Sequence, residues 1–263
     1  GFTINDEIEN LRAAQEHLKI VNLGATAIGT TVTAAPGYPE LAVKNLAELT
    51  GIDFKNSEDL IAATSDCGAY MTLSSAIKGL AVKMTKVCND IRLLASGPRC
   101  GLKEINLPQL QPGSSIMPGK VNPVAAEVAN QASFLAIGLD TTVMLAASAG
   151  QLELNVMEPV ITYALYTQMK VMTNACDTLR TKLVEGVTAN TERCKDYVMN
   201  SIGIVTLLKP HFGYQKCAAI AKEGYTTGKS LHQIVVDEQH LMTQAEWDAT
   251  FNTQNLIHPK FVK

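Results

Sequence analysis

The densest group of polar side chains in the sequence lies in a loop rich in glycine and proline, within residues 111–127. Nine consecutive residues carry the hydroxyl groups of Ser114 and Ser115, the ammonium group of Lys120 and the side-chain amide of Asn122. Glycine opens backbone dihedrals that other residues avoid and proline fixes its own, so this composition indicates a defined backbone shape. Because no acid lies among these polar groups, the loop suits a carboxylate ligand.

A helix is expected to begin directly after the loop. Asn122 is a typical N-cap, and Pro123 is a typical first residue of a helix. The N-terminus of a helix offers unpaired amide donors and partial positive charge, which favour an anion. Composition alone is equally compatible with a surface connection that glycine and proline merely turn. The convergence of hydroxyl groups, Lys120 and a helix start favours a binding site.

A serine in such a loop acts as a nucleophile or, less commonly, as a base. The nucleophile elbow of hydrolases needs a glycine two residues before and another two residues after the serine. Neither Ser114 nor Ser115 has both. A serine base needs a strongly stabilised alkoxide, and Lys120 together with clustered amide donors would supply that stabilisation. Backbone amides also stabilise a developing oxyanion or enediolate.

Glu127 lies one turn into the expected helix, which carries few other charges. Two interpretations are open: a buried acid that needs a partner, or a first-turn acid that is favourable to the helix dipole. The histidines give no comparable signal, because no two of them stand at a metal-ligand spacing. We therefore predict no metal site. The five are His17, His211, His232, His240 and His258.

The segment Gly224–Ser230 resembles a phosphate-binding loop only superficially. Three residues separate its glycines where the P-loop has four, and no strand is expected before it. We reject nucleotide binding at this segment and interpret Ser230 as a helix cap.

Length, charge and cysteine content restrict the class of protein. A chain of 263 residues can bury a substantial core. A net charge of -3 gives no basic face, which argues against nucleic acid as a partner. The sequence has no apolar run of about 18 residues, so we expect no membrane partner. The six scattered cysteines are expected to be reduced and mostly buried, as in a cytoplasmic protein.

Apolar residues at helical spacing predict five helices, joined by loops that glycine and proline mark. The helix at 123–149 is apolar on nearly all sides and must be buried on nearly all sides, which implies an oligomeric core. The expected helices span residues 6–22, 39–50, 65–95, 123–149 and 156–184, with long loops at 24–39 and 101–119.

Beyond residue 187 the sequence changes to short helices with clear caps. Asn190, Ser230 and Thr243 stand at expected helix starts, the last in a capping box with Glu246. The fold class is therefore predicted to be all-α. A long-helix bundle is expected over residues 1–187 and a small C-terminal helical domain over residues 188–263.

The segment Gly113–Pro123 resembles the signature loop of the aspartase/fumarase superfamily, whose members eliminate a group across a Cα–Cβ bond to release fumarate. Within the superfamily, the ammonia-lyases are more similar than the fumarases. The resemblance therefore implies elimination of ammonia from L-aspartate, with fumarate hydratase as one alternative and an inactive fragment or structural relative as another. The similarity covers nearly the whole chain, through residues 23–30, 63–69, 93–99, 104–111, 127–131, 155–161 and 197–205.

The resemblance also implies an assembly and a division of roles. Members of the superfamily form bundles from four subunits, so a homotetramer with active sites shared between chains is expected, acting on a small dicarboxylate. No cofactor is implied, and activation by a divalent cation is left open. Ser114 would remove the Cβ proton. Lys120 with Asn122 would bind the α-carboxylate, whereas Ser115 and the amides of Ile116 and Met117 would face the β-carboxylate as it becomes an enediolate.

Two departures from the superfamily pattern restrict what the chain is expected to do. Glu127 matches an acid that pairs with a histidine of another subunit, but the Thr-His-Leu-Gln motif that carries this histidine is absent here. Residues 29–33 read Gly-Thr-Thr-Val-Thr, where relatives usually have Gly-Thr-Gly and an Asn two positions on. The bundle domain is expected to be incomplete at its N-terminus, and the isolated 263-residue chain is expected to be inactive.

Overall fold

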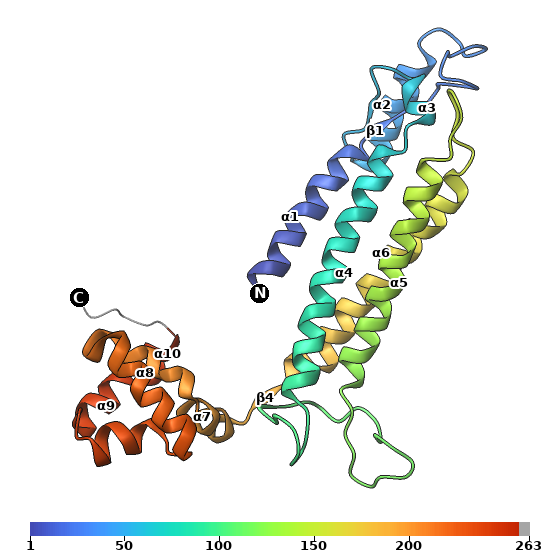
Figure 1. Ribbon diagram of the computed structural model, residues 1–263. Helices are drawn as coiled ribbons and strands as arrows, with labels where there is room; N and C mark the ends of the chain where they lie inside the picture. Colours follow the sequence, from blue (N-terminus) through green and yellow to red (C-terminus); the bar gives the residue numbers. More distant parts are fainter. Residues whose placement is uncertain (258–263) are drawn as a thin grey trace. The chain divides into compact units, whose positions relative to one another are not determined.

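The computed structural model describes residues 1–257. The chain divides into two compact units, and the boundary between them in the sequence lies between Thr188 and Ala189. Nearly all regular structure in both units is helical, which confirms the all-α fold class (Figure 1). Each unit has its own hydrophobic core. Among the described residues, no helix combines the length and hydropathy of a membrane span.

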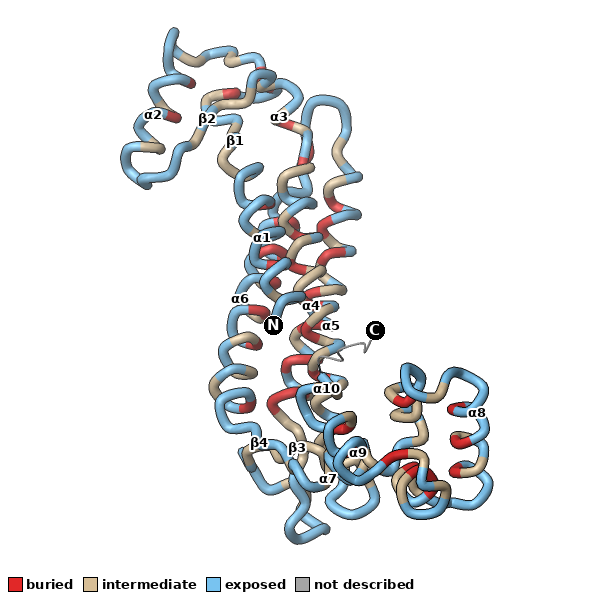
Figure 2. The backbone as a smooth tube through the Cα atoms, turned by 90° about the vertical axis from the view of Figure 1, so that its left-hand side faces the viewer, coloured by how far each residue is buried: buried red, intermediate tan, exposed pale blue. Residues whose placement is uncertain are grey.

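Four long helices build the first unit. They are α1 (Phe2–His17), α4 (Gly68–Leu94), α5 (Val124–Ala147) and α6 (Glu158–Lys182). Helix α5 packs against both α4 and α6, and α1 packs on α4. Figure 2 shows buried segments following the inner sides of these helices. The long bundle helices expected from the apolar spacing are therefore confirmed.

The end of α1 differs from the expectation. The helix stops at His17 rather than residue 22, because Ile20–Val21 form a strand, β1, that pairs in parallel with β2 (Lys55–Asn56). Between them lies α2 (Tyr38–Thr50), which stops as predicted at Gly51 with a left-handed backbone (φ +69°). A short helix, α3 (Ala62–Ser65), precedes α4.

Residues 24–34 form a loop with an unusual backbone. Thr26, Thr31 and Thr33 have φ values of +62°, +57° and +70°. Left-handed backbone is costly for a β-branched side chain and is readily adopted by Gly or Asn. The substitutions at 31 and 33 noted in the sequence therefore place threonine at two left-handed positions. At Gly29, an added Cβ would lie 2.3 Å from the Cα of Ile61, so this loop packs tightly on the chain before α3.

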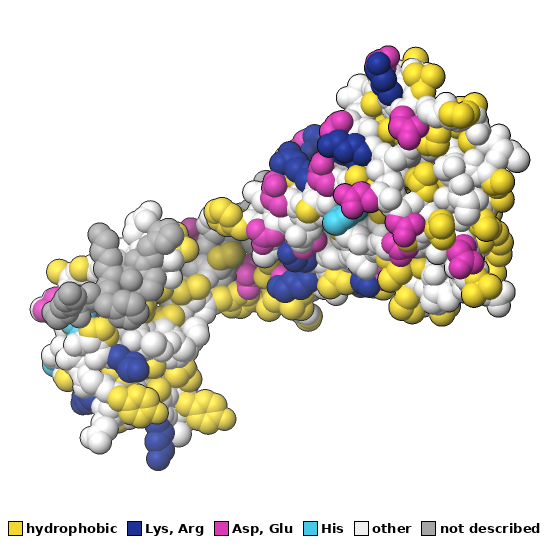
Figure 3. Space-filling view, turned by 90° about the horizontal axis from the view of Figure 1, so that it is seen from above, with side chains coloured by type: hydrophobic (Ala, Val, Ile, Leu, Met, Phe, Trp, Pro, Cys, Tyr) yellow, Lys and Arg dark blue, Asp and Glu magenta, His cyan; other side chains and the backbone are white. Residues whose placement is uncertain are grey.

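Helix α5 buries small side chains and exposes large ones. Its buried face is mainly alanine, with Asn130, Ser133 and Asp140, whereas Phe134 and Leu145 remain more than half exposed. Figure 3 shows hydrophobic side chains at the surface between charged ones. The helix is thus not covered on all sides within one chain. Several of its large apolar residues, such as Phe134 and Leu145, point away from the bundle that this chain forms, whereas Val143 is buried.

Two buried carboxylates connect the helices of the first unit. Asp140 of α5 accepts the hydroxyl of Ser74 at 2.7 Å and pairs with Lys78 at 2.5 Å, both from α4. Glu7 of α1, only 4% exposed, pairs with Lys83 of α4 at 2.5 Å. Buried charges need such partners, because their removal from water is otherwise unfavourable.

The second unit consists of short helices around Trp247, which is 2% exposed. The capping box is confirmed: Thr243 Oγ1 accepts the amide of Glu246 at 3.2 Å, and the Glu246 carboxylate accepts the amide of Thr243 at 2.8 Å. The elements are α7 (Thr191–Met199), η2 (Ile202–Leu208), α8 (Lys209–Thr227), η3 (Gln233–Glu238), α9 (Gln244–Thr250) and α10 (Thr253–Ile257).

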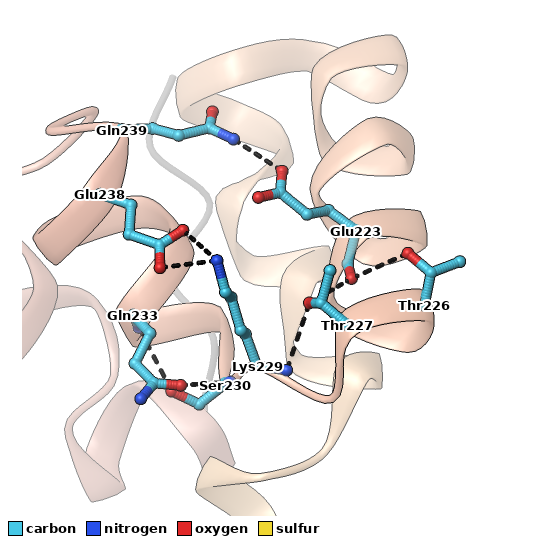
Figure 4. Close-up of polar contacts among 8 residues, drawn as sticks. All are labelled: Glu223, Thr226, Thr227, Lys229, Ser230, Gln233, Glu238 and Gln239. Carbon is cyan, nitrogen blue, oxygen red and sulfur yellow. Dashed lines mark hydrogen bonds and ion pairs between the residues drawn. The ribbon is translucent and has the colours of Figure 1, made fainter.

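The glycine-containing segment before η3 has its polar groups engaged within the unit (Figure 4). Lys229 forms an ion pair with Glu238 at 2.7 Å, and this hydrogen-bonded carboxylate raises the pKa of the Lys229 ammonium. Ser230 Oγ accepts the amide of Gln233 at 3.2 Å, so Ser230 caps a helical start as predicted. The Lys229 ammonium is therefore paired with a carboxylate of the same unit.

Candidate functional site

The polar loop is anchored at the end of the bundle by apolar contacts. It follows β3 (Ile105–Asn106), which pairs with β4 (Thr188–Ala189). Leu107 packs on the core shared by α4, α5 and α6. An added Cβ on Gly186 would lie 2.6 Å from Pro108, so the absence of a side chain at Gly186 makes room for the proline. These contacts fix the start of the loop, and α5 fixes its end.

The two ends of the loop are joined at a narrow neck. The amide of Gly113 donates to the carbonyl oxygen of Lys120 at 2.9 Å, and Asn122 Nδ2 donates to the carbonyl oxygen of Gly113 at 2.7 Å. Between them the chain turns, with the amide of Lys120 donating to the carbonyl of Met117 at 3.3 Å and Gly119 at φ +76°. The expectation that glycine defines the backbone shape here is met at Gly119, whose backbone is left-handed.

Ser114 is the residue around which the loop folds. Its Oγ accepts the backbone amides of Ile116 and Met117, each at 3.1 Å. Two N–H donors aimed at one oxygen stabilise negative charge on that oxygen. The predicted role of Ser114 as a base stays a prediction, and this arrangement is compatible with it. These two amides were expected to face a substrate carboxylate, but in the structure they donate to Ser114.

Asn122 does not have the position that was predicted for it. Helix α5 begins at Val124, and Pro123 rather than Asn122 is its N-cap residue, without a side-chain cap. The prediction of Asn122 as cap is therefore wrong. The physical reason is that its side chain is engaged by Gly113 across the neck of the loop, while its carbonyl oxygen accepts the amide of Val124 at 2.9 Å.

The remaining predicted ligands lie at the surface of the loop. Ser115, Ile116, Met117 and Lys120 are all exposed, and Ile116 is 86% exposed. Within the described part of the chain, the Lys120 ammonium makes no hydrogen bond or ion pair. The structure thus brings the predicted loop residues together and leaves one cation and one hydroxyl open to a ligand.

Glu127 lies in the first turn of α5 and is half-buried. Its side chain has no hydrogen bond or ion pair within the described residues. It borders a shallow groove together with Gln111, Gln131 and Thr178. The structure therefore agrees with the first-turn interpretation and not with a fully buried acid, because one side of the residue faces this open groove.

The structure gives no independent sign of a metal centre. In the described residues, no three His, Cys, Asp or Glu side chains come together in a way that could hold a metal ion. His17, His211, His232 and His240 lie outside the loop, and His258 lies outside the described residues. The donor set of the loop, hydroxyl groups and N–H donors with one ammonium, suits an anion.

Sequence reasoning missed the importance of Gly113. An added Cβ at this position would lie 2.1 Å from the carbonyl oxygen of Lys120. The signal in the sequence was a glycine directly before Ser114, in a loop whose other end carries the polar residues Lys120 and Asn122. Spacing alone does not show that residues 113 and 120 are in contact.

The chain is similar in sequence to known lyases. A family model described as lyase matches residues 3–138, and one described as fumarase C C-terminus matches residues 204–258. An aspartate ammonia-lyase of Escherichia coli (strain K12) is 55% identical over 261 residues, which are 99% of this chain and 54% of the relative. One from Helicobacter pylori is 50% identical over 263 residues, 100% of this chain and 56% of the relative. The chain spans about half the length of the curated relatives it matches.

Solved structures are similar over nearly all of the chain. A fumarate lyase:delta crystallin from Brucella melitensis bound to cobalt has a TM-score of 0.89 and 40% identity, covering 94% of this chain and 53% of that one. A class II fumarase from Schistosoma mansoni has a TM-score of 0.88 and 29% identity, covering 97% of this chain and 56% of that one. The helical fold is thus shared with proteins whose names refer to fumarate or fumarase.

Proposed function

Because this chain belongs to the lyase family, we propose that it acts in a carbon–nitrogen lyase that eliminates ammonia from L-aspartate to give fumarate. The relatives named aspartate ammonia-lyase, at 50% and 55% identity, support the choice of substrate. One structural observation carries the proposal of an elimination that begins with proton removal: Ser114 Oγ accepts two backbone amides, from Ile116 and Met117. An oxygen placed in this way can become a base.

The proposed reaction begins at Ser114. Its alkoxide, stabilised by the two amides, removes a proton from Cβ of L-aspartate. The electron pair of the broken C–H bond passes into the β-carboxylate, which becomes an enediolate. The enediolate then collapses, a Cα–Cβ double bond forms, and the C–N bond breaks, so that the electron pair of that bond leaves with ammonia. The product is fumarate.

We assign the other loop residues to the two carboxylates. Lys120 and the second N–H of the Asn122 amide hold the α-carboxylate, which suits their donor chemistry. Ser115 faces the β-carboxylate. As the proton passes to Ser114, negative charge moves from its oxygen to the β-carboxylate, and the amides of Ile116 and Met117 then favour the charged enediolate over the neutral hydroxyl. The reaction so described needs no organic cofactor, and activation by a divalent cation is a separate question.

We propose further that the enzyme is a homotetramer with shared sites. The support comes from α5 and α6, which expose large apolar side chains such as Phe134, Leu145, Tyr163 and Tyr166. Exposed apolar area of this extent on long helices is typical of an association surface. In the assembly of the joined protein, Glu127, half-buried and without a partner among the described residues, would pair with a histidine of another subunit, carried by the Thr-His-Leu-Gln motif that the 263 residues lack. We place the enzyme in the cytoplasm.

Fumarate hydratase is the second candidate. The match of residues 204–258 to the fumarase C C-terminus and the similarity to a class II fumarase favour it. Both reactions share proton removal from Cβ and differ in the leaving group. The loop alone therefore does not separate them.

The test is absorbance of fumarate at a fixed protein concentration, with L-aspartate and L-malate supplied separately. The chain is joined to the corresponding N-terminal region of a relative, and the isolated 263-residue chain is measured beside it. We expect fumarate from aspartate only in the joined protein. Activity on malate alone would favour the hydratase, and turnover of aspartate by the isolated chain would contradict the expected need for further residues.

A further inference from the structure

We propose that Asn122 is a positioning residue for Ser114, in addition to its contact with substrate. This inference rests on the proposed function, because it concerns the placement of the serine base. The side chain of Asn122 reaches back across the neck of the loop and donates through Nδ2 to the carbonyl oxygen of Gly113 at 2.7 Å. That carbonyl belongs to the peptide group that leads into Ser114.

Both polar groups of Gly113 are held at the same time. Its N–H donates to the carbonyl of Lys120 at 2.9 Å, and its C=O accepts from Asn122. Glycine has the widest range of backbone dihedrals of any residue, so a glycine before Ser114 fixes nothing by itself. The two hydrogen bonds therefore restrict the rotation that would otherwise move Ser114 away from its amide donors.

The geometry of the amide allows this role beside a ligand contact. A side-chain amide carries two N–H donors, and the bond to Gly113 uses one of them. Asn122 and Gly113 are both half-buried, so water competes only in part for the bond. A substrate carboxylate that binds the second N–H would hold Asn122 in the orientation that also holds Gly113. Binding of the substrate and placement of the serine base are thereby coupled.

The first experiment needs no activity. Amide hydrogen exchange is measured by NMR on the 263-residue chain without substrate. Asn122→Ala is expected to accelerate exchange at Gly113, Ile116 and Met117 about tenfold, the effect of losing one hydrogen bond. Ser114→Ala should accelerate exchange at Ile116 and Met117 only, because it removes their acceptor and leaves the neck closed. Unchanged exchange at all three amides in Asn122→Ala would overturn the proposal.

Two controls keep this result interpretable. Lys120→Ala removes a side chain that makes no hydrogen bond within the described residues, so exchange in the loop should stay unchanged. The amides of Ala129 and Ser133, which lie inside α5 beyond its unpaired first turn, report whether the bundle remains folded. If Asn122→Ala opens α5, Asn122→Asp replaces the donor by an acceptor of the same shape. It is expected to accelerate the same three loop amides, and its failure to do so would overturn the proposal.

The second experiment uses the joined, active protein. Asn122→Ala is expected to lower kcat about tenfold or more and to move the rising limb of the kcat–pH profile to higher pH, since the Ser114 alkoxide loses well-placed donors. A higher KM with unchanged kcat and pH profile would mean that Asn122 only binds substrate, and the positioning role would fail. If the unsubstituted joined protein releases no fumarate, while the exchange pattern is as expected, the proposed function and not the positioning role is contradicted.

Discussion

The amide of Gly113 donates to the carbonyl oxygen of Lys120 at 2.9 Å, and a Cβ atom on Gly113 would lie 2.1 Å from that same oxygen. The two ends of the loop are therefore closer together than any residue with a side chain at 113 allows. The neck holds Ser114 on one side and Lys120 on the other. Glycine at this position is thus a steric requirement of the proposed site.

Gly113→Ala is predicted to remove most of the activity of the joined protein. The added methyl group forces the neck apart and displaces Ser114, and a displacement of about 1 Å in a reacting group can cost on the order of 100-fold in rate. The measurement is kcat for fumarate release from L-aspartate. Circular dichroism should show unchanged helix content, because the substitution lies outside the helices.

Gly119→Ala is the matched control for this prediction. Gly119 has φ +76°, but a Cβ there meets no atom within 4 Å. Alanine should therefore cost only about 1 kcal/mol of backbone strain, with a much smaller effect on kcat. Equal losses in the two variants would show that general loop flexibility, and not the contact at the neck, accounts for the effect.

The ion pair between Glu7 and Lys83 makes the docking of α1 sensitive to acid. Hydrogen bonding to the Lys83 ammonium lowers the pKa of the Glu7 carboxyl below 4.5, although burial opposes this. A lowered folded-state pKa adds stability above the unfolded pKa, and that stability is lost as pH falls through the folded pKa. Glu7→Gln is predicted to lose about 1 kcal/mol of unfolding free energy at neutral pH. The difference from the parent should shrink towards pH 3.

Urea unfolding at several pH values measures this difference, with Glu9→Gln as control. Glu9 belongs to the same helix, but its pair with Arg12 is 70% exposed on both sides and should contribute little. A pH-independent difference for Glu7→Gln, or an equal effect of the two substitutions, would be at odds with a role for the buried pair.

Thr33 is predicted to be a site where glycine stabilises the protein. Its φ of +70° strains a β-branched residue, and the side chain is exposed, so little packing is lost. Thr33→Gly should raise the unfolding free energy by about 1 kcal/mol. Thr30→Gly is the control: Thr30 is exposed but has no positive φ, so glycine there should be destabilising by about 0.5 kcal/mol or more. A loss of stability in Thr33→Gly, measured by thermal unfolding, would refute the strain argument.

The cysteines should differ in their reaction with a thiol reagent. Burial raises the pKa of the Cys88 thiol to about 11, and Cys88 is fully buried, whereas Cys100 is exposed. Because the thiolate is the reactive form, Cys100 should be alkylated first at pH 8 and Cys88 only after unfolding. Peptide mass spectrometry after timed alkylation would show the order.

The expectation that the cysteines are mostly buried is wrong for Cys100, which lies in the loop after α4.

The sequence predicts the elements better than the contacts between them. The long helices follow from apolar spacing, and the loop that holds Ser114 follows from its polar residues. The strand at Ile20–Val21 could not be found, because two residues form it and its partner lies more than thirty positions away. Asn122 was a reasonable cap by residue type, yet its side chain has a better partner in Gly113. Such choices depend on tertiary contacts that spacing does not contain.

The incomplete burial of Glu127 and α5 also depends on contacts that the sequence pattern does not contain. A helix that is apolar on nearly all sides was expected to be buried, and the structure of one chain covers mainly its small residues. Glu127 is likewise only partly covered within one chain, because the groove that it borders is open. The homotetramer that we propose would account for both observations.

The central claim is that Ser114 is the base, and one measurement tests it most directly. Fumarate release from L-aspartate is compared between the joined protein and its Ser114→Ala variant, with Ser115→Ala as the neighbouring control. The account predicts a loss of about 1,000-fold or more for Ser114→Ala with the fold intact, and a smaller loss for Ser115→Ala. Turnover retained in Ser114→Ala would contradict it, because another group would then remove the Cβ proton.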